Sequence, residues 1–116
     1  MAIDLFGIPN CDTVKKARLW LEAQGLEYTF HDYKKEGADP VKVESWIGAE
    51  GIDTVLNKRG TTWRGLPEAE QARAADAIGA AALMVEHPSM IKRPVVEHDG
   101  GLLVGFDAAK WAGALT

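Results

Sequence analysis

The N-terminal third of the chain carries a strand, a helix and a second strand in close succession, and this order restricts the fold more than any other feature. An apolar run from Ile3 to Phe6 precedes an amphipathic helical pattern from Thr13 to Gln24. Residues 28–33 then alternate aromatic and polar side chains, which is typical of a strand. Because parallel strands need a long connection, this order predicts a parallel pair with a crossover helix.

The middle of the chain is predicted to be helical. Short apolar stripes are separated there by glycine, proline and charged residues, which are typical of helix ends and loops. The expected segments are a polar break over 34–37, a helix from Asp39 to Gly48, a short turn over 51–56, a basic loop over 57–65 and helices over 68–86 with a break near Gly79.

The C-terminal part predicts a hairpin and a last helix. Two apolar runs, 95–96 and 102–104, flank Asp99-Gly100-Gly101, a strong hairpin signal. Asp107 then provides an N-cap for the final helix. We therefore expect one α/β domain over residues 1–116, with a thioredoxin/glutaredoxin-like β-α-β…β-β-α core over 1–33 and 89–116 and a helical insertion over 34–88.

Composition bounds the classes of partner. The chain has 116 residues, 47% of them hydrophobic, and a net charge of −4, which argues against nucleic acid as the main partner because phosphate binding needs a concentrated basic face. The acidic N-terminal segment has no signal-peptide pattern, and no apolar run is long enough to span a membrane. We expect a cytoplasmic monomer that binds neither membrane nor nucleic acid.

Cys11 is the only cysteine, and it lies in the loop between the first strand and the first helix. The N–H groups and partial positive charge of a helix N-terminus favour a thiolate, and Lys15, Lys16 and Arg18 follow within two turns. We therefore expect an activated thiol rather than an inert core cysteine. Since no second cysteine is present, a redox cycle needs a thiol from outside the chain.

Polar residues surround this thiol. Asn10, Asp12 and Thr13 are all common N-cap residues, so they either cap the helix alone or also hydrogen-bond the sulfur or a ligand. Lys15 either faces solvent on the helix or contacts a ligand. The histidines lack the spacing of metal ligands, so no metal site is expected.

Seven blocks of sequence, in one order, run through nearly the whole chain. They are Phe6–Thr13 (FGIPNCDT), Lys15–Arg18, His31–Lys34, Leu56–Arg64, Ala82–Met84, Pro88–Val95 and Leu103–Phe106. In these blocks the chain resembles the ArsC/Spx family of arsenate reductases and their relatives, and most of all its YffB-type branch of glutathione-dependent thiol reductases.

The resemblance implies roles for individual residues. It implies that Cys11 is the catalytic nucleophile, that Arg93 stands beside it, and that the Arg93–Pro94 peptide bond is cis and faces the cysteine loop. Arg93 would be a fixed charge that stabilises the thiolate and binds an anionic group; the alternative is a surface arginine on a strand edge. The expected substrate- or glutathione-binding residues are Asn10, Asp12, Thr13, Lys15, Asn57, Arg59, Arg64 and Pro94.

The chain also departs from the arsenate reductases that it resembles, which place three arginines around the oxyanion. Arg93 matches the second of these. Asn57 stands at the first, with Arg59 and Arg64 nearby, and Gly105 replaces the third. Because a multiply charged oxyanion is costly to bury without cations, arsenate is disfavoured as the substrate. The loop arginines are either solvated or bind the carboxylates of glutathione.

We therefore expect an oxidoreductase of the arsenate reductase family, a glutathione-dependent monothiol reductase. Glutathione is expected as co-substrate, with no bound cofactor, and glutaredoxin as a further reductant. One alternative is an Spx-like, non-enzymatic regulator that binds RNA polymerase, although Val14 occupies the second cysteine position of the Cys-x-x-Cys switch. The other is a true arsenate reductase linked to glutathione and glutaredoxin.

Overall fold

The computed structural model describes residues 2–116 and divides the chain into two compact units. The first unit comprises the N-terminal residues through Glu36 together with Arg93–Thr116, and the second comprises Gly37–Lys92. Most of the predicted insertion, 34–88, therefore falls in the second unit. Within residues 2–116, no helix combines the length and the apolar character that crossing a membrane requires.

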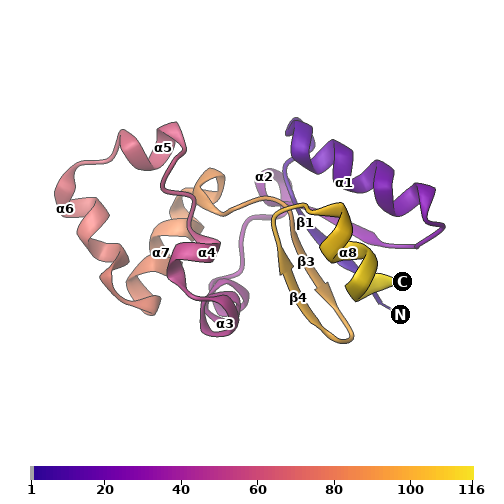
Figure 1. Cartoon of the computed structure of the whole chain (residues 1–116). Coiled ribbons are helices and arrows are strands. Elements are labelled where there is room, and N and C mark those ends of the chain that lie inside the picture. The colour runs from indigo at the N-terminus through magenta and orange to yellow at the C-terminus, as the bar shows by residue number, and fades with distance from the viewer. Residues whose placement is uncertain (1) are drawn as a thin grey trace. The chain divides into compact units, whose positions relative to one another are not determined.

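The first unit is built on a four-stranded mixed sheet. Its strands are β1 (Asp4–Gly7), β2 (Thr29–Asp32), β3 (Val95–His98) and β4 (Gly101–Val104), in the order β2-β1-β3-β4. Strand β1 pairs in parallel with β2 and antiparallel with β3, and β3 pairs antiparallel with β4. This sheet confirms the predicted α/β fold, the parallel pair and the hairpin (Figure 1).

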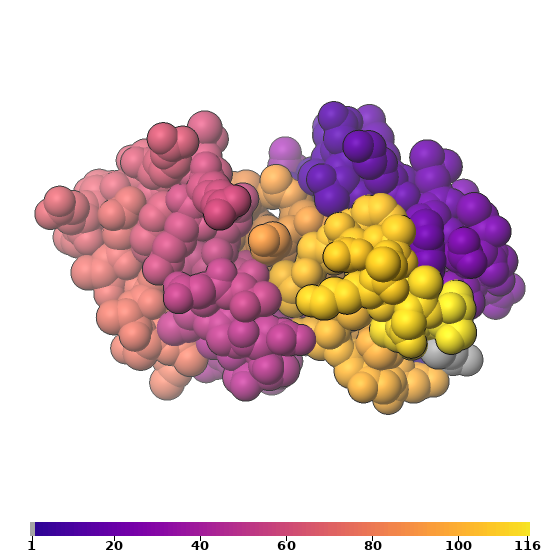
Figure 2. Space-filling view, viewed as in Figure 1, coloured from indigo at the N-terminus to yellow at the C-terminus, as the bar shows by residue number. Residues whose placement is uncertain are grey.

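Helices α1 (Asp12–Ala23) and α8 (Ala108–Leu115) pack on one face of this sheet. The spacing of the buried residues of α1, three and four positions apart, places them on one stripe of the helix. The atoms of α8 (yellow) lie beside those of the N-terminal segment that contains α1 (indigo to violet) in the space-filling view (Figure 2). The buried core of this layer consists of Ile3, Leu5, Val14, Ala17, Leu21, Val96, Trp111 and Leu115.

The predicted second strand ends one residue early. Tyr33, expected in the strand, instead begins the short helix α2 (Tyr33–Glu36), so the predicted polar break also contains a helical turn. The Asp32 carboxylate accepts a hydrogen bond from the Lys34 N–H at 2.8 Å. A side chain that accepts from a backbone N–H two residues ahead favours a turn over continued strand.

All regular elements of the second unit are helices, and one isolated β-bridge joins Leu56 and Ile91. Its longest helices pack against each other and bury Val43, Trp46 and Ile47 against apolar residues of the 77–86 segment. The helices are α3 (Pro40–Glu50), α4 (Ile52–Val55), α5 (Thr61–Arg64), α6 (Glu68–Gln71) and α7 (Ala77–Glu86), with 3-10 turns at Ala72–Ala75 and Pro88–Met90.

Three boundaries in this unit differ from the prediction. Helix α3 runs past Gly48 to Glu50, and the predicted 57–65 loop contains the turn α5. The helical break lies at Asp76 and not at Gly79, because the Asp76 carboxylate accepts from the Gly79 N–H at 2.7 Å and caps α7. A capping aspartate thus overrides the expected effect of the glycine.

Candidate active site around Cys11

Cys11 is itself the N-cap residue of α1. Its N–H donates to the Ile8 carbonyl at 3.2 Å, closing a turn through Pro9 and Asn10, and its own carbonyl accepts from the Lys15 N–H at 2.9 Å. Its backbone is extended, with φ −90° and ψ 126°. The prediction that Asn10, Asp12 or Thr13 caps the helix is therefore wrong, since the cysteine takes that place.

A close contact holds the first turn of α1 against the end of β1. A Cβ added to Gly7 would lie 2.8 Å from Cγ2 of Val14, closer than such atoms approach in real structures. Only glycine therefore allows this spacing without a shift. Gly7 thus fixes how near the helix N-terminus, with Cys11 at its head, lies to the strand end.

The Cys11 thiol is half-buried, and its pKa lies below the ordinary thiol value. Burial raises the pKa, but this effect is outweighed by the N–H of Val14, the Arg93 side chain, the N–H of Thr13 and the Arg93 charge, which all lower it. The cysteine makes no regular capping hydrogen bond to the helix, so these N–H groups act mainly on its ionised form. The helix N-terminus and one guanidinium together favour the thiolate.

The sheet register explains why Arg93 reaches Cys11. Phe6 on β1 faces Val95 on β3, so continuing this antiparallel pairing brings Arg93, two residues before Val95, to the end of the sheet where β1 leads into the cysteine loop. The Arg93–Pro94 peptide bond is cis, which confirms the prediction from the resemblance. Pro94 is buried, and its carbonyl accepts from the Gly105 N–H at 2.8 Å.

Tyr33 is a neighbour of this site that the sequence did not single out for a role. Its side chain is only 2% exposed, and its ring stacks on that of Phe6 with centroids 6.5 Å apart. Burial raises the pKa of the phenol, the Arg93 charge lowers it and the Glu97 charge raises it. Tyr33 therefore lies within electrostatic reach of Arg93, on the first turn after β2.

The predicted polar residues on the cysteine loop lie at the surface. Asn10, Asp12, Thr13 and Lys15 are all exposed, and only the Thr13 backbone acts on the sulfur. Arg18, which we expected to favour the thiolate, is engaged elsewhere. Its Nε donates to the Tyr28 hydroxyl at 2.9 Å and its guanidinium lies 4.1 Å from the Phe30 ring centroid.

The remaining predicted residues lie in the second unit. The Asn57 side chain accepts from the Arg59 N–H at 3.1 Å, so it orders its own loop. Exposed Arg64 ends helix α5. Exposed Arg59 lines a cavity of about 270 Å³ whose other lining residues are Asp53, Leu56, Asn57, Lys58 and Lys92. Binding of glutathione carboxylates by these residues stays a prediction.

Among residues 2–116, no three histidine, cysteine, aspartate or glutamate side chains lie in an arrangement that could hold a metal ion. The site built by the first unit is thus a single thiol, a guanidinium and a helix N-terminus. Such a set can stabilise a thiolate and bind an anionic group beside it.

Comparison with known proteins decides the family. The family model described as ArsC family matches residues 6–114. The chain belongs to the ArsC family. Its match begins just before the cysteine loop and ends within α8, so it includes both Cys11 and Arg93.

Individual relatives of this ArsC-family chain cover nearly its whole length. The solved structure of the YffB protein is 48% identical, with a TM-score of 0.94 and coverage of 98% of this chain and 99% of that one. A solved arsenate reductase (ArsC) related protein from Brucella melitensis is 49% identical, with a TM-score of 0.75 and coverage of 97% and 93%. An uncharacterized protein of Haemophilus influenzae is 39% identical over 97% of both chains.

Gly105, which the sequence resemblance puts at the third arginine position of the arsenate reductases, has a backbone role in this ArsC-family chain. Its φ is +79°, a region that side chains other than glycine rarely adopt. Its N–H bonds Pro94, and its carbonyl accepts from the Trp111 indole N–H at 3.1 Å. An arginine at position 105 would strain this turn, so the backbone conformation itself disfavours a cationic side chain there.

Proposed function

We propose that this ArsC-family protein is a glutathione-dependent monothiol reductase with Cys11 as its nucleophile. The observation that carries the proposal is the position of Cys11 at the N-cap of α1, where two backbone N–H groups and Arg93 lower the thiol pKa. A thiolate is the reactive form in disulfide exchange. The proposed setting is the cytoplasm, where glutathione keeps thiols reduced.

The proposed cycle transfers two electrons from two glutathione molecules to a substrate disulfide. The Cys11 thiolate attacks a substrate disulfide, so one substrate sulfur leaves as a thiolate and takes a proton, while the other forms a mixed disulfide with Cys11. A glutathione thiolate then displaces the second substrate sulfur and forms a Cys11–glutathione disulfide. A second glutathione attacks the glutathione sulfur, which yields glutathione disulfide and restores the Cys11 thiolate. Glutaredoxin is the alternative reductant for this last step.

The low thiol pKa supports both ends of this cycle. At neutral pH it raises the fraction of Cys11 present as the attacking thiolate. In the last step Cys11 is the leaving group, and a thiol of lower pKa leaves faster. Because Cys11 is the only cysteine, the second thiol has to come from another molecule.

The site supports thiol exchange better than arsenate reduction. Among residues 2–116, Arg93 is the one guanidinium that acts on the thiol. Gly105, at the position that the resemblance gives to the third arginine, has a backbone that disfavours a side chain. A mixed disulfide is neutral at the reacting sulfur, so it needs fewer cations than an oxyanion. Arsenate reduction therefore stays the second candidate.

Formation of glutathione disulfide from cystine and glutathione tests the proposal. We expect turnover with the unmodified chain, a glutathione adduct on Cys11 by mass spectrometry, and no turnover for Cys11→Ser. Lys110→Ala, which removes an exposed cation from α8, is the matched control and should retain full activity. Equal turnover in the Cys11→Ser variant, or the absence of any adduct, would contradict the proposal.

A further inference from the structure

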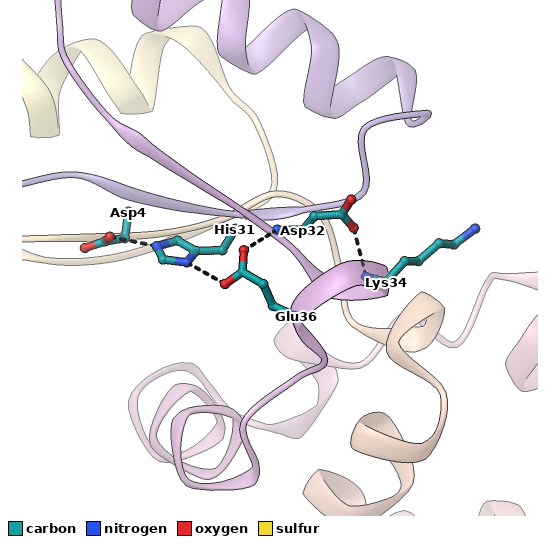
Figure 3. A network of polar contacts seen from close by, with 5 residues as sticks. All are labelled: Asp4, His31, Asp32, Lys34 and Glu36. Atoms are coloured by element: carbon teal, nitrogen blue, oxygen red, sulfur yellow. Dashed lines mark hydrogen bonds and ion pairs between the residues drawn. The ribbon is translucent and has the colours of Figure 1, made fainter.

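His31 is held between two carboxylates on the face of the sheet opposite α1 and α8 (Figure 3). Its Nε2 lies 2.9 Å from Oδ1 of Asp4 on β1, and its Nδ1 lies 3.2 Å from Oε1 of Glu36 at the end of α2. The ring also stacks on Phe6, with centroids 4.5 Å apart and planes 16° apart. Histidine thus links a strand to the short helix that follows its own strand.

The donor count of this arrangement fixes its protonation state. A carboxylate only accepts hydrogen bonds, whereas a neutral imidazole has one N–H donor and one acceptor nitrogen. Both bonds can therefore form together only when His31 is the imidazolium. Loss of one proton must break one of the two, and the bond to Glu36 is the longer.

Glu36 has a second role in the same cluster. Its Oε2 accepts from the Asp32 N–H at 3.2 Å, while its Oε1 faces His31. One carboxylate thus ties the last residue of α2 to both a side chain and the backbone of β2. Glu36 is also the last residue of the first unit before the chain enters the second at Gly37.

We propose that His31 is a pH-sensitive clasp that holds α2 against β2 while it is an imidazolium and releases the Glu36 end of α2 when it loses a proton. The released element is the segment through which the chain leaves the first unit. This inference concerns the 31–37 segment alone and does not depend on the thiol chemistry of Cys11.

The charged groups around the His31 ring favour its imidazolium form. Asp4 faces it from β1 and Glu36 from α2, while Glu97 on β3 lies opposite Asp4 in the register. Tyr33 on α2 is neutral, and the Lys34 side chain points away from the ring (Figure 3). Burial lowers the pKa of His31, but the bonds to Asp4 and Glu36 and the charges of both carboxylates outweigh this and raise it.

The sign of the pH effect follows from this shift. Because the pKa of His31 is raised in the folded chain, the stabilising effect of the clasp is fully present below the ordinary histidine value of about 6.5, as long as both carboxylates stay ionised. The clasp opens as the pH rises through the higher folded value. We therefore expect protection of the Asp32 N–H from hydrogen exchange, corrected for intrinsic rates, to fall over that range.

An NMR titration of the histidine rings in the full chain tests the clasp, with hydrogen exchange at Asp32 as the second readout. We expect His31 to titrate above about 6.5. Glu36→Gln should lower the pKa of His31. It should also speed hydrogen exchange at the Asp32 N–H about two- to fivefold at pH values where His31 is protonated. Glu27→Gln, an exposed glutamate of the same unit, removes the same charge and should change neither quantity.

Two results would overturn the clasp. One is titration of His31 at or below about 6.5 in the unmodified chain. The other is exchange at Asp32 that neither depends on the state of His31 nor changes in Glu36→Gln. Asp4→Asn is the second variant, and it should lower the His31 pKa while leaving the Asp32–Glu36 bond in place at pH values below that pKa.

Discussion

The N-termini of α1 and α8 lie in the same unit and are capped in opposite ways. Asp107 caps α8 by accepting from the N–H groups of Ala109 and Lys110 at 3.0 and 3.2 Å. At α1 the corresponding residue is Cys11, which makes no regular capping bond. The chain therefore uses a carboxylate where it needs a stable helix start, and a thiol where the N–H groups act on a reactive sulfur.

Two helices of the second unit also begin with an aspartate cap, as α8 does. Asp39 caps α3 by accepting from the Val41 N–H at 2.9 Å, and Asp76 caps α7. A good N-cap stabilises a helix by about 1 kcal/mol relative to a poor one. The comparison thus indicates that α1 forgoes part of this stabilisation at the residue that carries the proposed chemistry.

Replacing the thiol at the N-cap of α1 by a carboxylate should have the largest effect on activity and stability. Cys11→Asp should abolish reductase turnover, since the thiol is gone, and raise the free energy of unfolding by about 1 kcal/mol, since a carboxylate accepts from the N–H groups of α1. Turnover of glutathione and urea denaturation measure the two effects. A Cys11→Asp chain less stable than Cys11→Ala would show that α1 has no unfilled capping site.

Moving the α1 N-terminus away from the strand should come next in size. Gly7→Ala forces a Cβ against Val14, so we expect a loss of about 1–3 kcal/mol in unfolding free energy and a rise in the Cys11 pKa. Gly113→Ala is the matched control, because a Cβ there meets no atom within 4 Å. It should raise stability by up to about 1 kcal/mol. If Gly7→Ala proves as stable as Gly113→Ala, the close approach of Gly7 to Val14 does not fix the position of the α1 N-terminus.

Removing an ordinary cap should have a smaller, purely structural effect. Asp107→Ala should lower the free energy of unfolding by about 1 kcal/mol and leave the reactivity of Cys11 toward iodoacetamide unchanged. Urea denaturation and the alkylation rate measure the two quantities. A change in alkylation rate beyond that of Asp76→Ala would mean that the caps are not independent.

The smallest expected effect is on the pH dependence of the free energy of unfolding. Because the Cys11 pKa is lowered in the folded chain, its contribution to stability is present above the unfolded value of about 8.5 and is lost as the pH falls through the folded value. The difference in unfolding free energy between the unmodified chain and Cys11→Ser should therefore grow between about pH 6 and 9. A flat difference would contradict the lowered pKa.

Local signals in the sequence accounted for most of the elements of the first unit. The Asp99-Gly100 turn, the Asp107 cap and the apolar stripe of α1 each depend on residues close in sequence, and each was predicted correctly. Tyr33 was misassigned to the strand because its aromatic ring continued the alternation of β2. Its helical turn depends instead on two hydrogen bonds, which the Asp32 carboxylate accepts from the Lys34 N–H and the Glu36 carboxylate accepts from the Asp32 N–H.

The candidate site was less accessible to sequence reasoning. Cysteine is not a common N-cap residue, so the polar neighbours of Cys11 were the natural candidates for the cap. The approach of Arg93 to Cys11 depends on the pairing of β1 with β3, which are about 90 residues apart along the chain and which only the family resemblance connected. The prediction for Arg18 is wrong because its partners lie outside its own helix, Phe30 on β2 and Tyr28 just before that strand.

Titration of the Cys11 thiolate by its ultraviolet absorbance tests the central claim most directly. We expect a midpoint below about 8.5, the ordinary thiol value, and a higher midpoint in Arg93→Gln. Lys92→Gln, which removes the neighbouring exposed cation, is the matched control and should shift the midpoint less. A midpoint at or above about 8.5 in the unmodified chain would contradict an activated thiol at the N-terminus of α1.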